Sequence, residues 1–139
     1  MPLKAYQSMN AYKLFMMDVG LLGALSELPA EAILDGNDIF VEFKGALTEQ
    51  YVLQQMISDT PYTPYYYGTD KGTFEQDFLI QKERNIVPIE VKAEGNLRSQ
   101  SLKAYCEKFH PNMAVRLSAL KYKDQDWMIN LPLYAVCNL

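Results

Sequence analysis

The sequence predicts an α/β (α+β) protein in which helices cover the faces of a mixed β-sheet. Three patterns lead to this fold class. Apolar residues recur at helical spacing over Phe40–Ile57 and again over Arg98–His110. Two runs of β-forming residues, Phe74–Gln81 and Ile86–Ala93, lie between these helices, and the apolar run Met113–Leu120 follows the second helix. With one further short strand before the paired runs, the order of helix, three strands, helix and strand predicts a mixed sheet flanked by helices.

The N-terminal part of the chain predicts short elements. The apolar run Tyr12–Met17 fits either a short strand or the start of a helix. Asp18 is suited to cap the N-terminus of a helix over Val19–Leu28, because a proline follows that segment. We expect one more helical turn over Ala30–Leu34 and a turn over Asp35–Asp38.

Glu49 is the unusual residue of the predicted helix Phe40–Ile57. It lies on the apolar side, with small residues one turn before it and Val52 and Leu53 one turn after it. A carboxylate in that position is costly unless it is paired or bound to a metal. The alternative is that Glu49 lies at the edge of the apolar stripe and reaches solvent.

The two β-forming runs predict a hairpin with the four-residue connection Lys82–Asn85, preceded by a strand over Tyr65–Tyr67. If Gln81 pairs with Ile86, Asp77 lies opposite Glu90 and Glu75 lies opposite Lys92. One face of the hairpin then carries the charged side chains Glu75, Asp77, Glu90 and Lys92. The other face, expected to be the core face, carries Phe78, Ile80, Val87, Ile89 and Val91.

The charged face of this hairpin has the composition of a metal site for phosphate chemistry. Two carboxylates opposite each other repel, and a divalent cation such as Mg²⁺ would offset the repulsion. A metal, two carboxylates and the ammonium of Lys92 together can activate a water molecule and stabilise a pentacovalent phosphate. The simpler alternative is a solvated hairpin face with a surface ion pair.

Composition and charge argue against several classes of protein. The 139 residues fit one domain, and the net charge of −4 argues against a strongly basic nucleic-acid-binding coat. No apolar run is long enough to cross a membrane, and the N-terminus lacks a signal-peptide core. Cys106 and Cys137 lack metal-ligand or redox-motif spacing, which predicts reduced thiols in a cytoplasmic protein. His110, the only histidine, is interpreted as a helix-end residue, and no phosphate-binding Walker loop is present.

The charged residues resemble the active site of the PD-(D/E)xK, or restriction-endonuclease-like, superfamily. Its αβββαβ core carries a glutamate on a helix, an aspartate on the second strand and a (D/E)-x-K motif on the third. Glu49, Asp77 and the run Glu90-Val91-Lys92 match these positions. Gln76 stands where the motif has proline, at a position that varies widely in the superfamily.

A longer resemblance extends over most of the chain. Its blocks are KLFMMDVGLL, KGALTEQYVLQQM, YYYGTDKGTFEQDFLI, IVPIEVKAEGNLRSQSLKAYCEKFHP and INLPLYAV. They are similar to an uncharacterised domain found at the C-terminus of bacterial and archaeal AAA-type ATPases. The resemblance implies that residues 1–139 form a single nuclease-like domain, either the C-terminal part of a longer ATPase or a naturally short relative.

Together these observations leave three functions open. In the first, a Mg²⁺- or Mn²⁺-dependent nuclease domain, Asp77 and Glu90 hold the metal. Lys92 positions the attacking water, and Glu49 binds a second metal or orients Lys92. In the second, the chain is a non-catalytic module that binds DNA, another nucleic acid or a protein, or regulates an ATPase domain in cis. In the third, the four residues form a buried ion network without a ligand.

Overall fold

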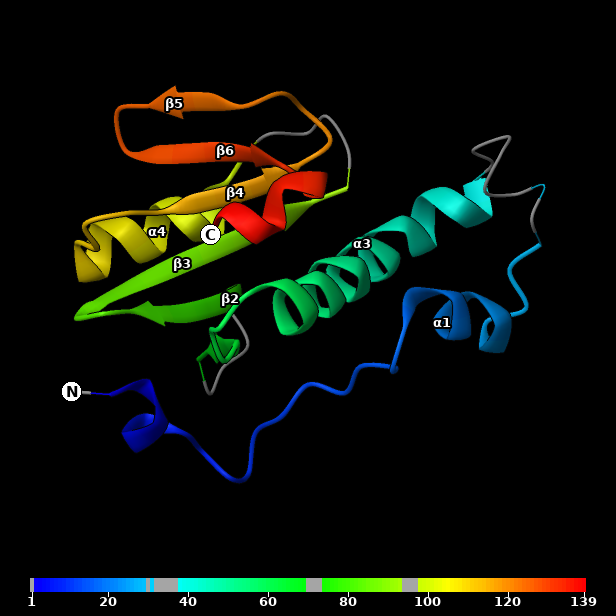
Figure 1. Ribbon diagram of the computed structural model, residues 1–139, viewed down its shortest axis with the longest axis horizontal. Helices are drawn as coiled ribbons and strands as arrows, with labels where there is room; N and C mark the ends of the chain where they lie inside the picture. The colour runs from blue at the N-terminus through cyan, green and yellow to red at the C-terminus, as the bar shows by residue number, and fades with distance from the viewer. Residues whose placement is uncertain (1, 30, 32–37, 70–73, 94–97) are drawn as a thin grey trace.

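In the computed structural model, which describes residues 2–29, 31, 38–69, 74–93 and 98–139, a mixed β-sheet forms the centre of the protein (Figure 1). The strands of the described part are β1 (Tyr65–Gly68), β2 (Glu75–Lys82), β3 (Asn85–Lys92), β4 (Val115–Ser118), β5 (Lys123–Gln125) and β6 (Met128–Pro132). Their order is β1-β2-β3-β4-β6-β5. The β3–β4 and β4–β6 pairs are parallel and the other pairs are antiparallel. The predicted mixed sheet is therefore confirmed.

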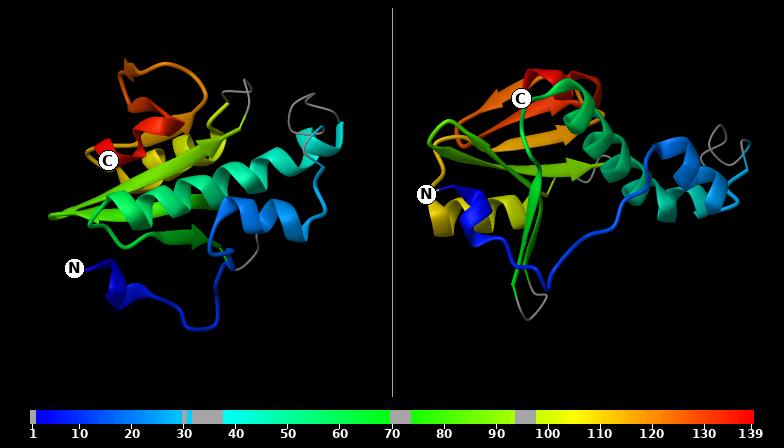
Figure 2. Two further views of the ribbon diagram at one scale, coloured as in Figure 1. Left: turned by 45° about the vertical axis from the view of Figure 1, so that its right-hand side comes forward. Right: turned by 60° about the horizontal axis from the view of Figure 1, so that its bottom comes forward.

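Helices cover both faces of this sheet. The α-helices are α1 (Val19–Leu25), α3 (Asp38–Asp59) and α4 (Gln100–Phe109), and the 3-10 helices are η1 (Leu3–Tyr6) and η2 (Leu133–Asn138). α3 and η2 lie on one face, α4 lies on the other, and α1 lies beside α3 (Figures 1 and 2). The predicted fold class, an α/β (α+β) sheet flanked by helices, is confirmed.

The main core lies between α3 and the sheet. Val52 and Met56, one turn apart on α3, are fully buried against the apolar face of the β2–β3 hairpin. The core side chains of the sheet are those that the alternation predicts, namely Phe78, Ile80, Val87, Ile89 and Val91, continued by Val115 and Leu117 of β4. A second, smaller cluster lies under α4 and contains Leu102. Burial of both clusters fixes α3 and α4 on opposite faces of the hairpin.

The hairpin has the predicted register and a shorter connection. Gln81 pairs with Ile86, as expected, but Lys82 and Asn85 also pair. Only Glu83 and Arg84 then remain as the turn, in place of the predicted four residues. Glu83 adopts a left-handed backbone with φ of 57°, which closes the tight connection.

The C-terminal part differs from its prediction. The sequence predicts a charged loop over Lys121–Asp126 and two separate short apolar runs over Trp127–Ile129 and Leu131–Val136. In the structure the first segment contains the strand β5, and the single strand β6 joins the two runs. β5 pairs only with β6 at the edge of the sheet, so its side chains need not be apolar. The second run, for which the sequence allows a turn or a strand, continues from β6 into the 3-10 helix η2.

The N-terminal part is confirmed at its cap and corrected elsewhere. The Asp18 carboxylate accepts a 2.7 Å hydrogen bond from the Leu21 N–H and caps α1, which ends three residues earlier than predicted. Tyr12–Met17, expected as a strand or helix, is extended chain without regular structure. The predicted turns at 30–37 lie largely outside the described residues, and Asp38 is the first residue of α3. His110 ends α4 with φ of 48°, as its interpretation as a helix-end residue requires.

Candidate functional site

The β2 and β3 strands separate at the position where the predicted acidic residues lie. The ladder of paired residues ends at Phe78 and Ile89. Beyond it, the Val91 N–H donates a 2.7 Å hydrogen bond to Oδ2 of Asp77. The buried Gln76 amide likewise donates to the Ile89 carbonyl at 2.7 Å. Two side chains of β2 thus bridge the gap to the β3 backbone, and they fix the Asp77 carboxylate in the fork between the strands.

The Asp77 carboxyl has an unfavourable environment for its charge. Its pKa is raised from 3.8 to about 6, and burial is the main cause. The negative charges of Glu49 and Glu90 contribute to this increase, whereas the hydrogen bond from Val91 and the ammonium of Lys13 oppose it. These interactions place both predicted carboxylates in the electrostatic neighbourhood of Asp77. A cation bound in the fork would lower the free energy of the ionised form.

Glu90 lies on the central strand β3 and is only 3% exposed. Its Oε1 atom forms an ion pair with Nζ of Lys92 at 2.9 Å. Its Oε2 atom is buried and finds no hydrogen-bond partner among the described residues. A buried carboxylate oxygen without a partner is costly, so this atom is free to accept a ligand or a cation.

Arg116 is a charged neighbour of Glu90 that the sequence analysis missed. The two residues are paired across the β3–β4 ladder, and both are buried. Burial lowers the pKa of Arg116, while the charge of Glu90 acts in the opposite direction. The Arg116 Nε donates to Oδ1 of Asn130 at 2.8 Å, which orients the guanidinium. An arginine inside the apolar run Met113–Leu120 was the signal that could have indicated this role.

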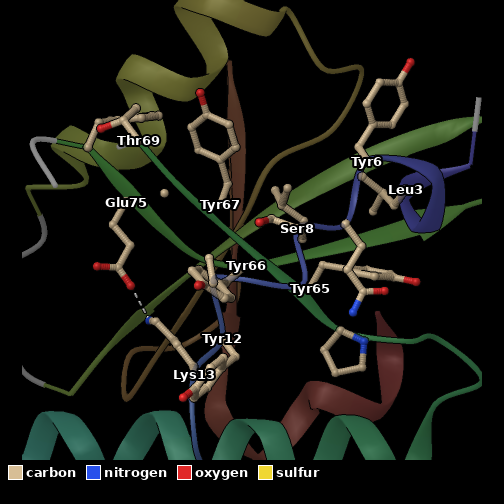
Figure 3. Close-up of a pocket in the computed structure, with 16 residues that line it drawn as sticks. Leu3, Tyr6, Ser8, Tyr12, Lys13, Tyr65, Tyr66, Tyr67, Thr69 and Glu75 are labelled. Carbon is tan, nitrogen blue, oxygen red and sulfur yellow. Dashed lines mark ion pairs between the residues drawn. The ribbon is translucent and has the colours of Figure 1, made fainter. Parts of the chain in front are cut away.

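Glu49 faces the same region from α3, where its closest described charge is a lysine. The Lys13 ammonium lies 3.6 Å from Oε2 of Glu49. It also lies 2.5 Å from Oε1 of Glu75, and Figure 3 shows this ion pair. The same ammonium lies 5.6 Å from the ring centre of Tyr66. Burial alone would lower the pKa of Lys13, but the three carboxylates of Glu75, Glu49 and Asp77 outweigh it and raise the pKa. Glu49 is therefore paired, and with 32% of its side chain exposed it also reaches solvent, so both sequence interpretations hold in part.

The sequence indicates Glu75 as a residue of the charged hairpin face, but it does not indicate Lys13 as a site residue. Glu75 was placed on the charged hairpin face, where it was expected opposite Lys92; in the structure its side chain pairs with Lys13. Lys13 was not identified as a site residue. It is the one charged residue in the run Tyr12–Met17, and this was the available signal. Spacing cannot predict the contact, because Lys13 lies far from Glu49 and Glu75 in sequence and meets them only in the folded chain.

The arrangement has two charged parts. One is the fork, where Asp77, Glu90 and Lys92 lie on adjacent strands. The other is the Lys13 cluster, defined as Lys13 with Glu49 and Glu75. Within the described ranges, no three Asp, Glu, His or Cys side chains are grouped closely enough to hold a metal ion together. The fork therefore offers a pair of carboxylates rather than a preformed cage.

A cavity of about 770 Å³ opens beside the Lys13 cluster (Figure 3). Its wall combines the N-terminal segment with β1, and it includes Tyr6, Tyr12, Tyr65, Tyr66 and Tyr67. The Tyr67 ring packs edge-on against Phe74, Tyr105 and Phe109. Tyr67 thus has a structural role, while the cavity as a whole provides an aromatic surface next to the charged residues.

The fold and the fork define an α/β domain with a helix-flanked mixed sheet and two carboxylates and a lysine at the point where its central hairpin opens. Comparison with protein families assigns this domain more narrowly. Residues 44–135 match the model of the domain of unknown function DUF4143, and the chain belongs to that family. No match was found among curated proteins or among solved structures.

No helix in the described part of the chain is both long and apolar enough to cross a membrane.

Proposed function

We propose that the fork between β2 and β3 is a divalent-metal site for the hydrolysis of phosphodiester bonds in nucleic acid, as in a PD-(D/E)xK nuclease. The observation that carries this proposal is the unpartnered, buried Oε2 atom of Glu90 beside the Asp77 carboxyl. Lys92 pairs with Oε1 of Glu90 and leaves Oε2 without a partner, so a divalent cation would compensate the negative charge that remains on the two carboxylates. Mg²⁺ and Mn²⁺ fit, because hard divalent ions select carboxylate oxygens.

In this proposal the residues have separate roles. Asp77 and Glu90 hold the metal, which when bound acidifies a water molecule and polarises the phosphate. Lys92 keeps Glu90 oriented through its 2.9 Å ion pair, and its partly exposed ammonium lies where it can approach a phosphate oxygen. Glu49 faces the site from α3, where Lys13 pairs with it and offsets its charge. The tyrosine-lined cavity beside the site gives a surface on which bases can stack.

A cleavage assay tests this function. Labelled single- and double-stranded DNA and RNA are incubated with the protein in Mn²⁺, and the products are separated by size. We expect cleavage by the wild type, loss of at least about a hundredfold in Glu90→Gln and Lys92→Met, and no change in the exposed-lysine control Lys103→Met. Cleavage that persists in both site variants would show that the fork is not the active site.

A second candidate is a non-catalytic binding module for a protein or nucleic acid, in cis with an AAA-type ATPase domain. The observation that favours it is the apolar surface of the N-terminal segment, where Met9, Leu14 and Met17 are each more than 80% exposed. This candidate predicts that Met9→Ser, Leu14→Ser and Met17→Ser leave metal binding unchanged and weaken binding of the ATPase domain. Equal binding by wild type and the triple variant in a pull-down with the purified ATPase domain would exclude it.

A further inference from the structure

Lys13 reaches the acidic residues on a segment that is fixed in place by glutamines. We define residues 7–17 as the N-terminal arm; they form no helix or strand. The buried amide of Gln50 accepts a 2.8 Å hydrogen bond from the Met16 N–H and donates a 2.9 Å bond to the Met16 carbonyl. Gln54 accepts from the Val19 N–H at 3.0 Å, and Gln81 accepts from the Leu3 N–H at 2.9 Å. These contacts hold the chain on both sides of Lys13.

We call the two hydrogen bonds between Gln50 and Met16 the Gln50 clamp, and they fix the arm at one residue of its backbone. Gln50 is 2% exposed and uses its amide as a backbone would, satisfying both hydrogen-bonding groups of Met16. It also lies next to Glu49 on α3, so the helix turn that holds the arm is the one that presents a carboxylate to it. Because both the oxygen and the nitrogen of this buried amide are hydrogen-bonded to Met16, the position of the arm is fixed, and Lys13 enters the acidic region as part of the arm.

The position of Lys13 bears on how many divalent metal ions the site can bind. Its ammonium contacts Glu75 at 2.5 Å and Glu49 at 3.6 Å, and no such cation contacts Asp77 within the described ion pairs. In the fork, the unpartnered oxygen belongs to Glu90. The positive charge that a second metal would supply to Glu49 is therefore supplied by the chain itself.

We propose that Lys13 is a positioning residue and the resident cation of this site, which engages Glu49 and Glu75 and limits the site to a single divalent metal at Asp77 and Glu90. The inference rests on the proposed metal site and specifies its stoichiometry. It assigns Glu49 as a partner of Lys13 and not as a metal ligand. Removal of the ammonium leaves the pair Glu49 and Glu75 without its internal cation, and a second divalent ion bound by that pair then compensates its charge.

Counting bound Mn²⁺ by electron paramagnetic resonance tests this inference without an activity readout. The wild type, Lys13→Met, Lys13→Arg and Lys4→Met, a control in η1 that precedes the arm, are titrated with Mn²⁺, and the free ion is measured. We expect one Mn²⁺ per chain in the wild type, in Lys13→Arg and in Lys4→Met, and a second Mn²⁺ in Lys13→Met. One ion in both wild type and Lys13→Met, or two in the wild type, overturns the inference while the metal site stands. The absence of binding in every chain overturns both.

A second variant keeps the test valid if Lys13→Met fails to fold. Glu49→Gln in the wild-type background removes a partner of Lys13 but no ligand of the single metal. We expect its Mn²⁺ affinity to stay within about twofold of the wild type, whereas Asp77→Asn loses about tenfold or more. A tenfold loss in Glu49→Gln would show that Glu49 ligates the metal and would overturn the inference.

Discussion

At the scale of single residues, the charge of Asp77 controls the site. Burial and the neighbouring carboxylates raise its pKa from 3.8 to about 6 in the folded protein. A raised carboxyl pKa means that the folded chain holds its proton to higher pH than the unfolded chain does. The associated stability is complete below about pH 4 and is lost as the pH rises through 6. At neutral pH the folded protein therefore carries an ionised Asp77 carboxylate in the fork, where burial makes the charge unfavourable.

Replacing this charge gives a pH-dependent prediction. Asp77→Asn keeps an oxygen for the Val91 N–H and removes the ionisation, so we expect it to stabilise the metal-free protein at pH 8 by about 1–3 kcal/mol. At pH 4 the difference should vanish, because Asp77 is then protonated. Urea unfolding at both pH values measures it, with the exposed Asp124→Asn as the matched control. A variant that is equally destabilised at both pH values would contradict this assignment.

At the scale of elements, local sequence patterns predict the hairpin, but they do not predict which distant segments of the chain contact it. The Gln81–Ile86 register follows from alternation and a nearby turn, so the hairpin could be predicted from sequence. The expected pairing of Asp77 with Glu90 is not part of the ladder, which ends at Phe78 and Ile89, and Asp77 instead accepts from the Val91 N–H. Lys13 and Arg116 could not be placed from sequence, because their contacts with the site arise from the arm crossing to α3 and from a parallel neighbour strand. β5 was missed since an exposed edge strand needs no apolar alternation.

The hydrogen bonds between Gln50 and the arm are expected to contribute to the stability of the folded protein. Gln50→Ala removes both hydrogen bonds to Met16 and leaves a small cavity, so we expect a loss of about 2 kcal/mol in the free energy of unfolding. Gln55→Ala, on the same helix, should change it by less than about 0.5 kcal/mol. Denaturant unfolding measures both, and trypsin should cleave at Lys13 faster in Gln50→Ala alone. Equal stability of the two variants would show that the clamp does not hold the arm.

At the scale of the whole molecule, the strand order explains why the charged residues can interact. β3 lies between β2 and β4, so Glu90 has Asp77 on one side and Arg116 on the other. α3 and η2 cover one face and α4 covers the opposite one, which removes the central strands from solvent (Figure 2). The shared fold leaves the chemistry open, because one scaffold can carry both active and inactive sites.

The metal proposal makes a prediction for the folded state as a whole. A ligand that binds only the folded chain stabilises it, and at a concentration about a hundred times its Kd the gain is about 2.7 kcal/mol. We therefore expect Mn²⁺ to raise the Tm of the wild type by several degrees in a thermal unfolding experiment. Ca²⁺-free buffer and the double variant Asp77→Asn/Glu90→Gln provide the controls. An equal shift in wild type and double variant would assign the effect to other carboxylates.

The most direct measurement is a calorimetric titration of Mn²⁺ into the wild type and into Asp77→Asn/Glu90→Gln at neutral pH. Both substitutions keep the size of the side chains, and circular dichroism checks that the double variant is folded. The account predicts saturable binding to the wild type that is absent from the double variant. Folded wild-type protein that takes up no Mn²⁺ at millimolar concentration would contradict the metal site and with it the proposed hydrolysis.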